Sequence, residues 1–498
     1  MTISQFIFVP LGTAFLISLV ARKKEKVAGA IAMIAMAWLC VASIIVFFQL
    51  PAENGMIVET TSEWGIPFTI PLVLDYLSLF LLVLISVIGF ISALYSLQYL
   101  EHFTGRWGFF SLYMLMITGM NGVVLSGDFF NLYVFMEISL ISAYSLVAFG
   151  TEAEELEAAF KYATMGAITS TMILFGIGIL YSLTSTLNMA DVGIHLETMG
   201  TKRILYLVYG LFIAGFGLKT ALVPFHAWLP DAHPSAPAPI SAMLSGVLIK
   251  TLGVYSLVRI FFNIFGAPQV VLTILLILGT LSIVIGGFLA FVQWDYKRLL
   301  GFSSISQVGY IILGIGLGTP LGILGGILHL LYHGIFKSLM FLNSGAVEYA
   351  TGSRDLRTMG GLSKPLKVTS ATSLIGTFAI SGVPPFNGFF SKLIIIIACI
   401  QADQAVFGII AGLMSIITLA YFLKVQRHVF YGEAGTAKVT ERVPGAMKTA
   451  MIVLAVLCLL TSLMLVPPLK SIAFDPVVDA IAIKTGYLYK ILPLIGGI

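Results

Sequence analysis

The sequence predicts an all-α polytopic membrane protein with about fourteen transmembrane helices. Fifty-eight per cent of the residues are hydrophobic and only 10% are charged, whereas a soluble domain has about 25% charged residues. A soluble fold of this length could not bury that much apolar surface. The apolar residues fall into runs of about 20, the length that crosses a bilayer, and the basic residues gather in alternate loops between these runs.

The first predicted span, residues 3–21, is followed at once by "ARKKEK". This charge order is wrong for a cleaved signal peptide, so we expect the run to be retained as a transmembrane helix. The linkers are short; the two longest, "PAENGMIVETTSEWGIPFTIP" and "YGEAGTAKVTERVPGAMK", are not expected to form separate domains. The predicted spans are centred near residues 12, 38, 85, 118, 139, 173, 217, 249, 281, 310, 333, 385, 415 and 457.

Basic residues are distributed unevenly between the two sets of loops. Seventeen Lys and Arg residues lie in loops that follow odd-numbered spans, whereas loops after even-numbered spans hold only Lys202, Arg203 and Arg259. The positive-inside rule places the first set in the cytoplasm. Both termini are therefore expected to face away from the cytoplasm. Since the basic residues mark the ends of apolar runs, the net charge of +4 gives no sign of nucleic-acid binding.

The sequence gives no sign of a metal or cofactor site. Cys40, Cys399 and Cys458 lie within apolar runs, lack metal-ligand spacing and are expected to be packing residues without a disulfide. The chain has no CxxC set, nucleotide-binding glycine loop or haem-like histidine placement. We therefore predict no cofactor and no redox or hydrolytic active site in this chain, and leave open whether it serves a larger oxidoreductase.

Several ionisable residues lie inside the predicted spans. A charge at the centre of a membrane helix costs roughly 2.5–3.5 kcal/mol even on the lenient insertion scale. A series of such groups is typical of a proton or ion path. The alternatives are buried ion pairs and side chains that snorkel to the interface, the latter strongest for Lys337, which lies nearer the end of its span. The candidate path residues are Glu137, Lys219, Lys250, His329, His333, Lys337 and Lys392.

Histidines add to this pattern. His329, His333 and Lys337 are spaced at i, i+4 and i+8, which places all three on one helix face. This arrangement favours a hydrated relay over a single structural histidine. His226 and His233 flank "AWLPDA", and the sequence leaves open whether they are loop, interface or functional residues.

Two predicted spans, the seventh and the twelfth, contain helix breakers. Pro224 follows Lys219 by about one turn, and Pro384 and Pro385 precede Lys392. Breakers are tolerated in a membrane where the freed backbone groups face protein or water. Because the two broken spans are five spans apart, they have opposite orientations, which is typical of an inverted-topology repeat. The predicted divisions are residues 1–105 (spans 1–3), 106–265 (spans 4–8), 266–430 (spans 9–13) and 431–498 (span 14 and the tail).

Six segments of the chain carry a resemblance to known membrane proteins: "VLDYLSLFLL", "NLYVFMEISLIS", "GLKTALVPFHAWLPDAHPSAPAPISAMLSGVLIKTLGVYSLVR", "DYKRLLGFSSISQVGYI", "HLLYHGIFKSLMFLNSG" and "GVPPFNGFFSK". They resemble the antiporter-like membrane subunits that are shared by Mrp-type cation/proton antiporters, respiratory complex I and energy-converting membrane-bound hydrogenases. The resemblance extends over nearly the whole chain, and within the family it is nearest to the D subunit of the Mrp antiporters.

The resemblance implies a role for each candidate residue. Glu137 and Lys219 would be the ion pair of a first half-channel, and Lys250 would pass the proton toward the centre. The histidines and Lys337 would form a central hydrated link, and Lys392 would end the second half-channel. One complex I member has glutamate at this last position, so Lys392 argues against that member. The short tail after the fourteenth span also argues against the largest relatives, which carry a long lateral helix.

The family implies a subunit of a prokaryotic plasma-membrane complex that moves H⁺, coupled to Na⁺, beside other integral membrane subunits. The first hypothesis is the proton-translocating subunit of an Mrp-type antiporter. The second is the ion-pumping membrane arm of a hydrogenase or a complex I-like enzyme, because the same residues serve both. A stand-alone solute transporter is a weaker third hypothesis.

Overall fold

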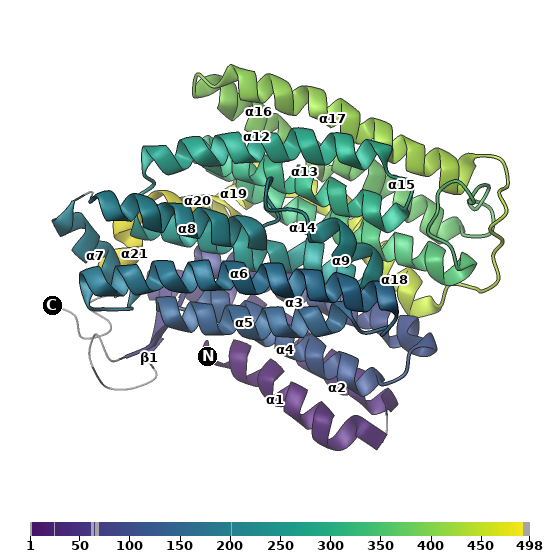
Figure 1. The fold of residues 1–498 in the computed structure, drawn as a ribbon, viewed down its shortest axis with the longest axis horizontal. Helices are drawn as coiled ribbons and strands as arrows, with labels where there is room; N and C mark the ends of the chain where they lie inside the picture. Colours follow the sequence, from purple (N-terminus) through teal and green to yellow (C-terminus); the bar gives the residue numbers. More distant parts are fainter. Residues whose placement is uncertain (1, 24, 61–63, 65–68, 201, 492–498) are drawn as a thin grey trace.

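The computed structural model describes residues 2–23, 25–60, 64, 69–200 and 202–491. Long helices run side by side along the longest axis of the molecule (Figure 1). Eleven of the described helices are long and apolar enough to cross a membrane, and two shorter apolar helices, Gln5–Val20 and Asn387–Gln401, accompany them. The predicted all-α polytopic architecture is confirmed.

The helices follow one another with short connections. The first half contains α1 (Gln5–Val20), α2 (Glu25–Gln49), α3 (Tyr76–Tyr99), α4 (Arg106–Leu125), α5 (Phe129–Val147), α6 (Ala153–Thr184), α7 (Met189–Met199), α8 (Arg203–Lys219), α9 (Leu229–Ser235), α10 (Ala238–Met243) and α11 (Ser256–Val258). The second half contains α12 (Gln269–Val292), α13 (Tyr296–Gly316), α14 (Pro320–Thr351), α15 (Lys367–Ser381), α16 (Asn387–Gln401), α17 (Ala405–Val425), α18 (Gly445–Leu460), α19 (Pro467–Ala473), α20 (Asp475–Ala482) and α21 (Lys484–Ile491).

The length criterion gives eleven spans among the described residues where fourteen are expected. The first expected span falls on α1, which has only 16 residues, and the breakers shorten two others. The predicted centre near residue 217 falls on α8, which is 17 residues long and ends at Lys219. The centre near residue 385 falls between α15 and α16, where Gly382 adopts φ +79°. Both breaks contain a cis peptide bond, at Val223–Pro224 and at Pro384–Pro385.

The segment after the second span forms a β-hairpin, whereas the sequence predicts only a linker there. Strand β1 (Met56–Thr60) pairs antiparallel with β2 (Pro71–Asp75), with Met56 opposite Asp75. At the end of β2, the Asp75 carboxylate accepts a hydrogen bond from the Ser78 N–H at 2.9 Å, which caps α3. The apolar pattern of the sequence does not predict these strands.

Both described ends of the chain lie at the hairpin end of the bundle. The Ser4 N–H donates to the Glu59 carboxylate of β1 at 3.0 Å, and Lys490 Nζ donates to the Asn54 carbonyl at 2.9 Å (Figure 1). An even number of membrane crossings brings the two ends to one side. Which side faces the cytoplasm stays a prediction from the loop charges.

The two predicted five-helix sets pack in the same order. Helix α5 lies between α4 and α6, and α6 packs on α8; likewise α13 lies between α12 and α14, and α14 packs on α16. Asp128 begins α5 and Asp295 begins α13, and each caps its helix by accepting the N–H three residues on. Each also forms an isolated backbone bridge, with Asn188 and Asp355 respectively. This parallel supports the repeat, whose inverted orientation and boundaries stay predictions.

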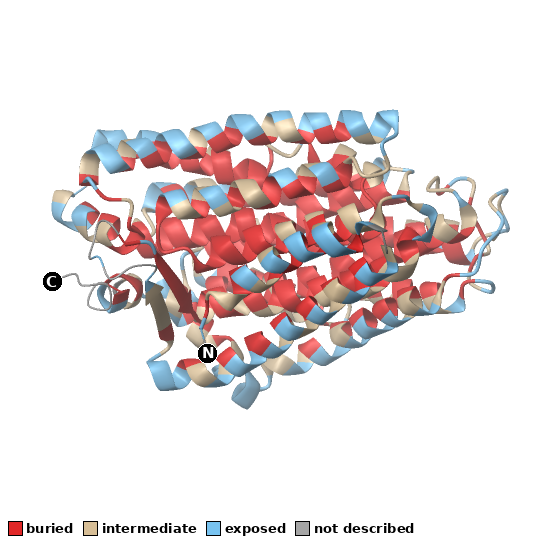
Figure 2. Cartoon of the chain, turned by 90° about the horizontal axis from the view of Figure 1, so that it is seen from below, coloured by how far each residue is buried: buried red, intermediate tan, exposed pale blue. Residues whose placement is uncertain are grey.

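The centre of the bundle is formed by α13, α14 and the continuous helix Ala238–Ile264. The most apolar windows of these three helices are 94–100% buried within the chain. Figure 2 shows buried residues filling the interior and exposed residues along the outer helices. These three helices therefore carry ionisable residues that are enclosed by protein: Lys250, Arg259, His329, His333 and Lys337.

Candidate functional site

Lys219 and Glu137 are connected through a serine hydroxyl. Lys219 is 2% exposed, and its Nζ donates to the Ser170 Oγ on α6 at 2.9 Å and to the Gly166 carbonyl at 3.1 Å. The Ser170 hydroxyl donates in turn to the Glu137 carboxylate of α5. The resemblance implies a direct ion pair; among the described residues, Ser170 stands between the two charges instead.

Small and aromatic residues shape this end of the path. Gly166 accepts a hydrogen bond from Lys219 through its carbonyl, and a side chain at this position would collide with the Tyr144 hydroxyl. That hydroxyl is buried without a hydrogen-bond partner among the described residues. A buried polar group without a partner is costly, and it is normally satisfied by water.

The break after Lys219 is held together by side chains. The Trp228 Nε1–H donates to the Leu218 carbonyl at 3.0 Å, and the Val223 N–H donates to Ser282 Oγ at 3.0 Å. Backbone groups that lose their helical partners must find others inside a membrane. These bonds explain how the chain tolerates Pro224 within the bundle.

Lys250 lies on an irregular part of the helix Ala238–Ile264. Leu244–Leu248, Lys250–Tyr255 and Arg259–Ile264 are π-helical, and such turns occur frequently at functional sites. Lys250 is fully buried, and its Nζ donates to the carbonyl of Ser245 and, at 2.7 Å, to that of Gly246. Its contacts among the described residues are carbonyls, so no carboxylate offsets its charge.

Two glycines bring this helix close to α14. A methyl group at Gly334 would lie 3.1 Å from the Gly246 carbonyl and 2.9 Å from a Leu84 methyl. Only the absence of both side chains permits this spacing. This contact places Lys250 next to the face of α14 that carries the histidines. Lys250 and Lys337 both lie close enough to His333 for their charges to act on its imidazole.

His329, His333 and Lys337 are 0% exposed. The two imidazole centroids are 6.3 Å apart, and both ring nitrogens of His333 lack a partner among the described residues. Lys337 Nζ donates to the Leu300 carbonyl at 2.7 Å. Because Lys337 is completely enclosed, the snorkelling alternative is wrong for this residue.

The second half of the path ends at Lys392, near the start of α16. Its Nζ donates to the Ile380 carbonyl at 2.8 Å and lies 4.7 Å from the centroid of the Tyr310 ring. The neighbouring Ser391 hydroxyl lies 2.9 Å from His329 Nδ1. Lys392 therefore connects to the histidine row. A serine hydroxyl joins Lys219 to Glu137, whereas among the described residues no hydroxyl joins Lys392 to a carboxylate.

The count of basic residues assigns Arg259 to a loop, and this assignment is wrong. The count places it in a loop after the eighth span, but it is 1% exposed inside the helix Ala238–Ile264. Both of its terminal nitrogens donate to the Asp75 carboxylate at 2.7 Å. The helix is 27 residues long, so Arg259 lies within it and its partner is far away in sequence.

The two histidines that flank "AWLPDA" differ. His226 is half-buried in the break, whereas His233 on α9 is 0% exposed. Both ring nitrogens of His233 lack a partner among the described residues. The imidazole lies 4.4 Å, centroid to centroid, from the Phe341 ring.

The chain as a whole is similar to known membrane proteins. Residues 126–418 match the family described as NADH:quinone oxidoreductase/Mrp antiporter, transmembrane region. The chain belongs to this family. Residues 62–110 also match the N-terminal family of complex I chain 5.

Two curated members of the family come from its two branches. The chain is 34% identical over 382 residues to the D subunit of the Na⁺/H⁺ antiporter of Alkalihalophilus pseudofirmus, covering 76% of this chain and 77% of that one. It is 36% identical over 374 residues to the N subunit of the NADH-quinone oxidoreductase of Desulforudis audaxviator, covering 74% of each. The two branches of the family are thus similarly near.

Solved structures of the antiporter-like family give the same fold. A chain of the Mrp complex from Dietzia sp. matches with a TM-score of 0.90 and 26% identity, covering 98% of this chain and 99% of that one. A chain of the archaeal membrane-bound sulfane sulfur reductase matches with a TM-score of 0.91 and 29% identity at the same coverage. The protein is an antiporter-like, multi-pass subunit of the type found in prokaryotic Mrp antiporters and complex I-like redox complexes.

Proposed function

We propose that this chain is the proton-translocating subunit of a multisubunit Mrp-type cation/proton antiporter, in which proton movement is coupled to Na⁺ transport. The observation that carries the proposal is the series of ionisable groups inside the spans, which runs from the half-buried Glu137 through buried lysines and histidines to Lys392. An unpaired charge at membrane depth is costly, and such series are typical of proton relays.

The mechanism rests on the Ser170 bridge. When Glu137 is drawn toward Ser170, its negative charge lies near Lys219 and favours the ammonium form. When Glu137 turns away, Lys219 keeps only the carbonyl of Gly166 and a neutral hydroxyl. Loss of a nearby opposite charge weakens the hold of a buried lysine on its proton. The proton would then pass toward Lys250.

The centre of the path suits transfer in small steps. His333 lies within electrostatic reach of Lys250, Lys337 and Lys392. An imidazole has two nitrogens and ionises near neutrality, so it can take a proton on one side and release it on the other. From His329 the contact with Ser391 leads to the segment that holds Lys392.

A redox-driven pump is the second candidate. It is favoured by the similarity to the N subunit of an NADH-quinone oxidoreductase and to a chain of the sulfane sulfur reductase. In that case the same path would carry protons or Na⁺ under the drive of a redox partner. The buried residues of this chain serve both mechanisms equally.

Purification of the intact complex from its native membrane tests the choice. Small integral membrane partners without iron, together with Na⁺-dependent proton movement in reconstituted vesicles, would support the antiporter. Co-purifying iron–sulfur or nickel–iron subunits would support the redox pump and overturn the antiporter assignment. Sodium-independent flux without either partner set would contradict both.

A further inference from the structure

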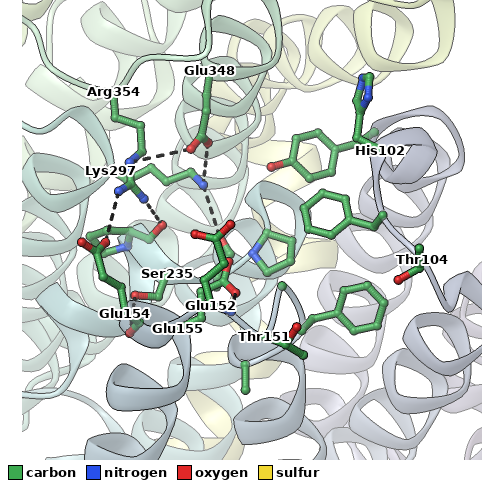
Figure 3. Close-up of a pocket in the computed structure, with 18 of the residues that line it drawn as sticks. His102, Thr104, Thr151, Glu152, Glu154, Glu155, Ser235, Lys297, Glu348 and Arg354 are labelled. Carbon is green, nitrogen blue, oxygen red and sulfur yellow. Dashed lines mark hydrogen bonds and ion pairs between the residues drawn. The ribbon is translucent and has the colours of Figure 1, made fainter.

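A polar cavity of about 840 Å³ lies at the end of the bundle opposite the β-hairpin. It is bounded by the connections after α3 and α5, the segment Pro234–Pro237, the start of α13 and the end of α14 (Figure 3). The loops at this end are the basic ones that the charge rule assigns to the cytoplasm. The charged residues that line the cavity are Glu152, Glu154, Glu155, Lys297, Glu348 and Arg354.

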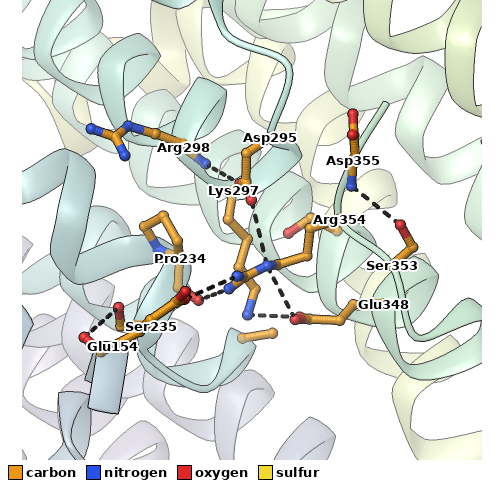
Figure 4. Close-up of polar contacts among 12 residues, drawn as sticks. Glu154, Pro234, Ser235, Asp295, Lys297, Arg298, Glu348, Ser353, Arg354 and Asp355 are labelled. Carbon is orange, nitrogen blue, oxygen red and sulfur yellow. Dashed lines mark hydrogen bonds and ion pairs between the residues drawn. The ribbon is translucent and has the colours of Figure 1, made fainter. Parts of the chain in front are cut away.

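One ion pair connects this cavity to the protein interior. Lys297 Nζ lies 2.7 Å from Glu348 Oε2, with the lysine side chain 3% exposed and the glutamate side chain 26% exposed. Arg354 Nε lies 3.7 Å from the other carboxylate oxygen of Glu348 (Figure 4). Glu348 therefore faces both the water of the cavity and a buried ammonium group.

His233 lies close to this ion pair, beside the same face of α13. Lys297 donates to the Ala236 carbonyl at 3.2 Å, in the segment that follows His233. Lys297 and Gly301 are one turn apart on the same face of α13, and a methyl group at Gly301 would lie 3.4 Å from His233 Cδ2. The imidazole thus packs against α13 one turn further along the helix than Lys297, beside Gly301.

On its other side, His233 packs against the Phe341 ring, which is also a neighbour of Lys337 on the central path. The Phe341 ring lies 4.4 Å from the imidazole, and Lys337 Nζ lies 5.6 Å from the centroid of that same ring. Lys337 and Lys297 both lie close enough to His233 for their charges to act on the imidazole. Because its two nitrogens are buried and unpartnered among the described residues, His233 has donor and acceptor capacity that no structural contact uses.

We propose that this cavity is the cytoplasmic entry for protons, with Glu348 as the collecting carboxylate and His233 as the link to Lys337. The proposal rests on the proposed function and adds the point, at Lys337, where protons from the cytoplasm join that path. Glu348 takes a proton from cavity water, and Lys297, relieved of its counter-charge, releases a proton toward His233. The neutral amine then recovers the proton from Glu348, and His233 passes its own proton to the Lys337 side, so every group returns to its first state.

The test uses inside-out membrane vesicles that contain the assembled complex, in which the cavity faces the bath. Glu348→Gln keeps the shape of the side chain but removes its titration, and is expected to slow proton transport at least about tenfold. Formate or azide in the bath carries protons into aqueous cavities and is expected to restore most of the lost rate. Such rescue would not follow from a purely structural role.

Glu154→Gln is the matched control. Glu154 lines the same cavity, but its side chain is 86% exposed and lies 3.9 Å from Arg354, outside contact with Lys297. This variant is expected to transport within about twofold of wild type. His233→Gln removes no hydrogen bond among the described residues, so it is expected to assemble normally and to lose transport at least about tenfold, without rescue by the bath acids.

Wild-type rates in Glu348→Gln or His233→Gln, or an assembled Glu348→Gln complex that formate and azide leave slow, would overturn the entry site. If Glu348→Gln fails to assemble, the His233→Gln rate decides alone. Failure of the proposed function gives a different result, because the wild-type complex itself would then move no protons.

Discussion

Lys219 and Glu137 share one hydroxyl: the ammonium donates to Ser170 at 2.9 Å, and Ser170 donates to the Glu137 carboxylate. The hydroxyl can keep this orientation only while the Glu137 carboxyl group lies near it. It therefore couples the position of an acid on α5 to the charge of a lysine at a broken helix. This bridge is the feature of the first half-channel that the second half-channel lacks among the described residues.

Ser170→Ala is expected to slow proton transport severalfold, because Glu137 and Lys219 lose the group that joins them. Ser170→Thr keeps the hydroxyl and is expected to retain most of the rate. Ser182→Ala is the control on the same helix, since the exposed Ser182 hydroxyl donates only to its own helix at Ile179. Equal rates in the Ser170→Ala and Ser182→Ala complexes would remove the bridge from the mechanism.

Gly334→Ala is expected to reduce transport severalfold by pushing α14 away from the Gly246 carbonyl and Lys250. Gly210→Ala on α8 meets open space, and alanine favours a helix over glycine by about 1 kcal/mol. That control is expected to be as active as wild type and at least as stable. Vesicle flux assays and thermal unfolding of the purified complex measure the two effects, and matching behaviour of both variants would contradict the close packing.

Arg259→Met is expected to destabilise the protein by about 3–5 kcal/mol, because it leaves the Asp75 carboxylate buried without its partner. The exposed pair of Arg357 and Asp355 provides the control, and Arg357→Met is expected to change stability by less than about 0.5 kcal/mol. Thermal unfolding of the purified complex compares the two. A melting temperature of Arg259→Met equal to that of Arg357→Met would show that the buried pair contributes nothing.

Asp128 gives a pH-dependent prediction outside the spans. Burial raises the pKa of Asp128 to about 6, so the folded state binds its proton more tightly than the unfolded chain. The resulting stability is present below the unfolded pKa and is lost as the pH rises through about 6. Asp128→Asn keeps a good helix cap and is expected to stabilise the protein by about 2–3 kcal/mol at pH 8. The gain should vanish in acid, below the pKa of the unfolded chain. An equal gain at pH 8 and in acid would contradict this origin.

The helices and the buried charges can be predicted from the sequence because both follow from local composition. Runs of apolar residues mark the spans, and Lys219, Lys250 and Lys392 stand out within them. The two breaks are also visible, since Pro224 and the prolines near residue 385 interrupt otherwise continuous runs.

The partners of these groups cannot be predicted from local composition. Ser170 is one serine among many on a small-residue face, and only the approach of α6 to α8 gives it a role. Arg259 lies near a span end, where charge alone cannot separate a loop residue from a buried one, and its partner Asp75 ends a hairpin that the apolar pattern does not reveal. The π-helical turns around Lys250 likewise carry no signal in the apolar pattern.

The rate of proton transport by the assembled Lys219→Ala complex tests the central claim most directly. Among the described residues, the Lys219 ammonium donates only to Gly166 and Ser170, so the variant is expected to assemble with its partner subunits. Its transport rate is expected to fall below about 1% of wild type, with Lys392→Ala also impaired. Wild-type transport by Lys219→Ala vesicles would contradict the path; wild-type transport by Lys392→Ala alone would remove only its second half.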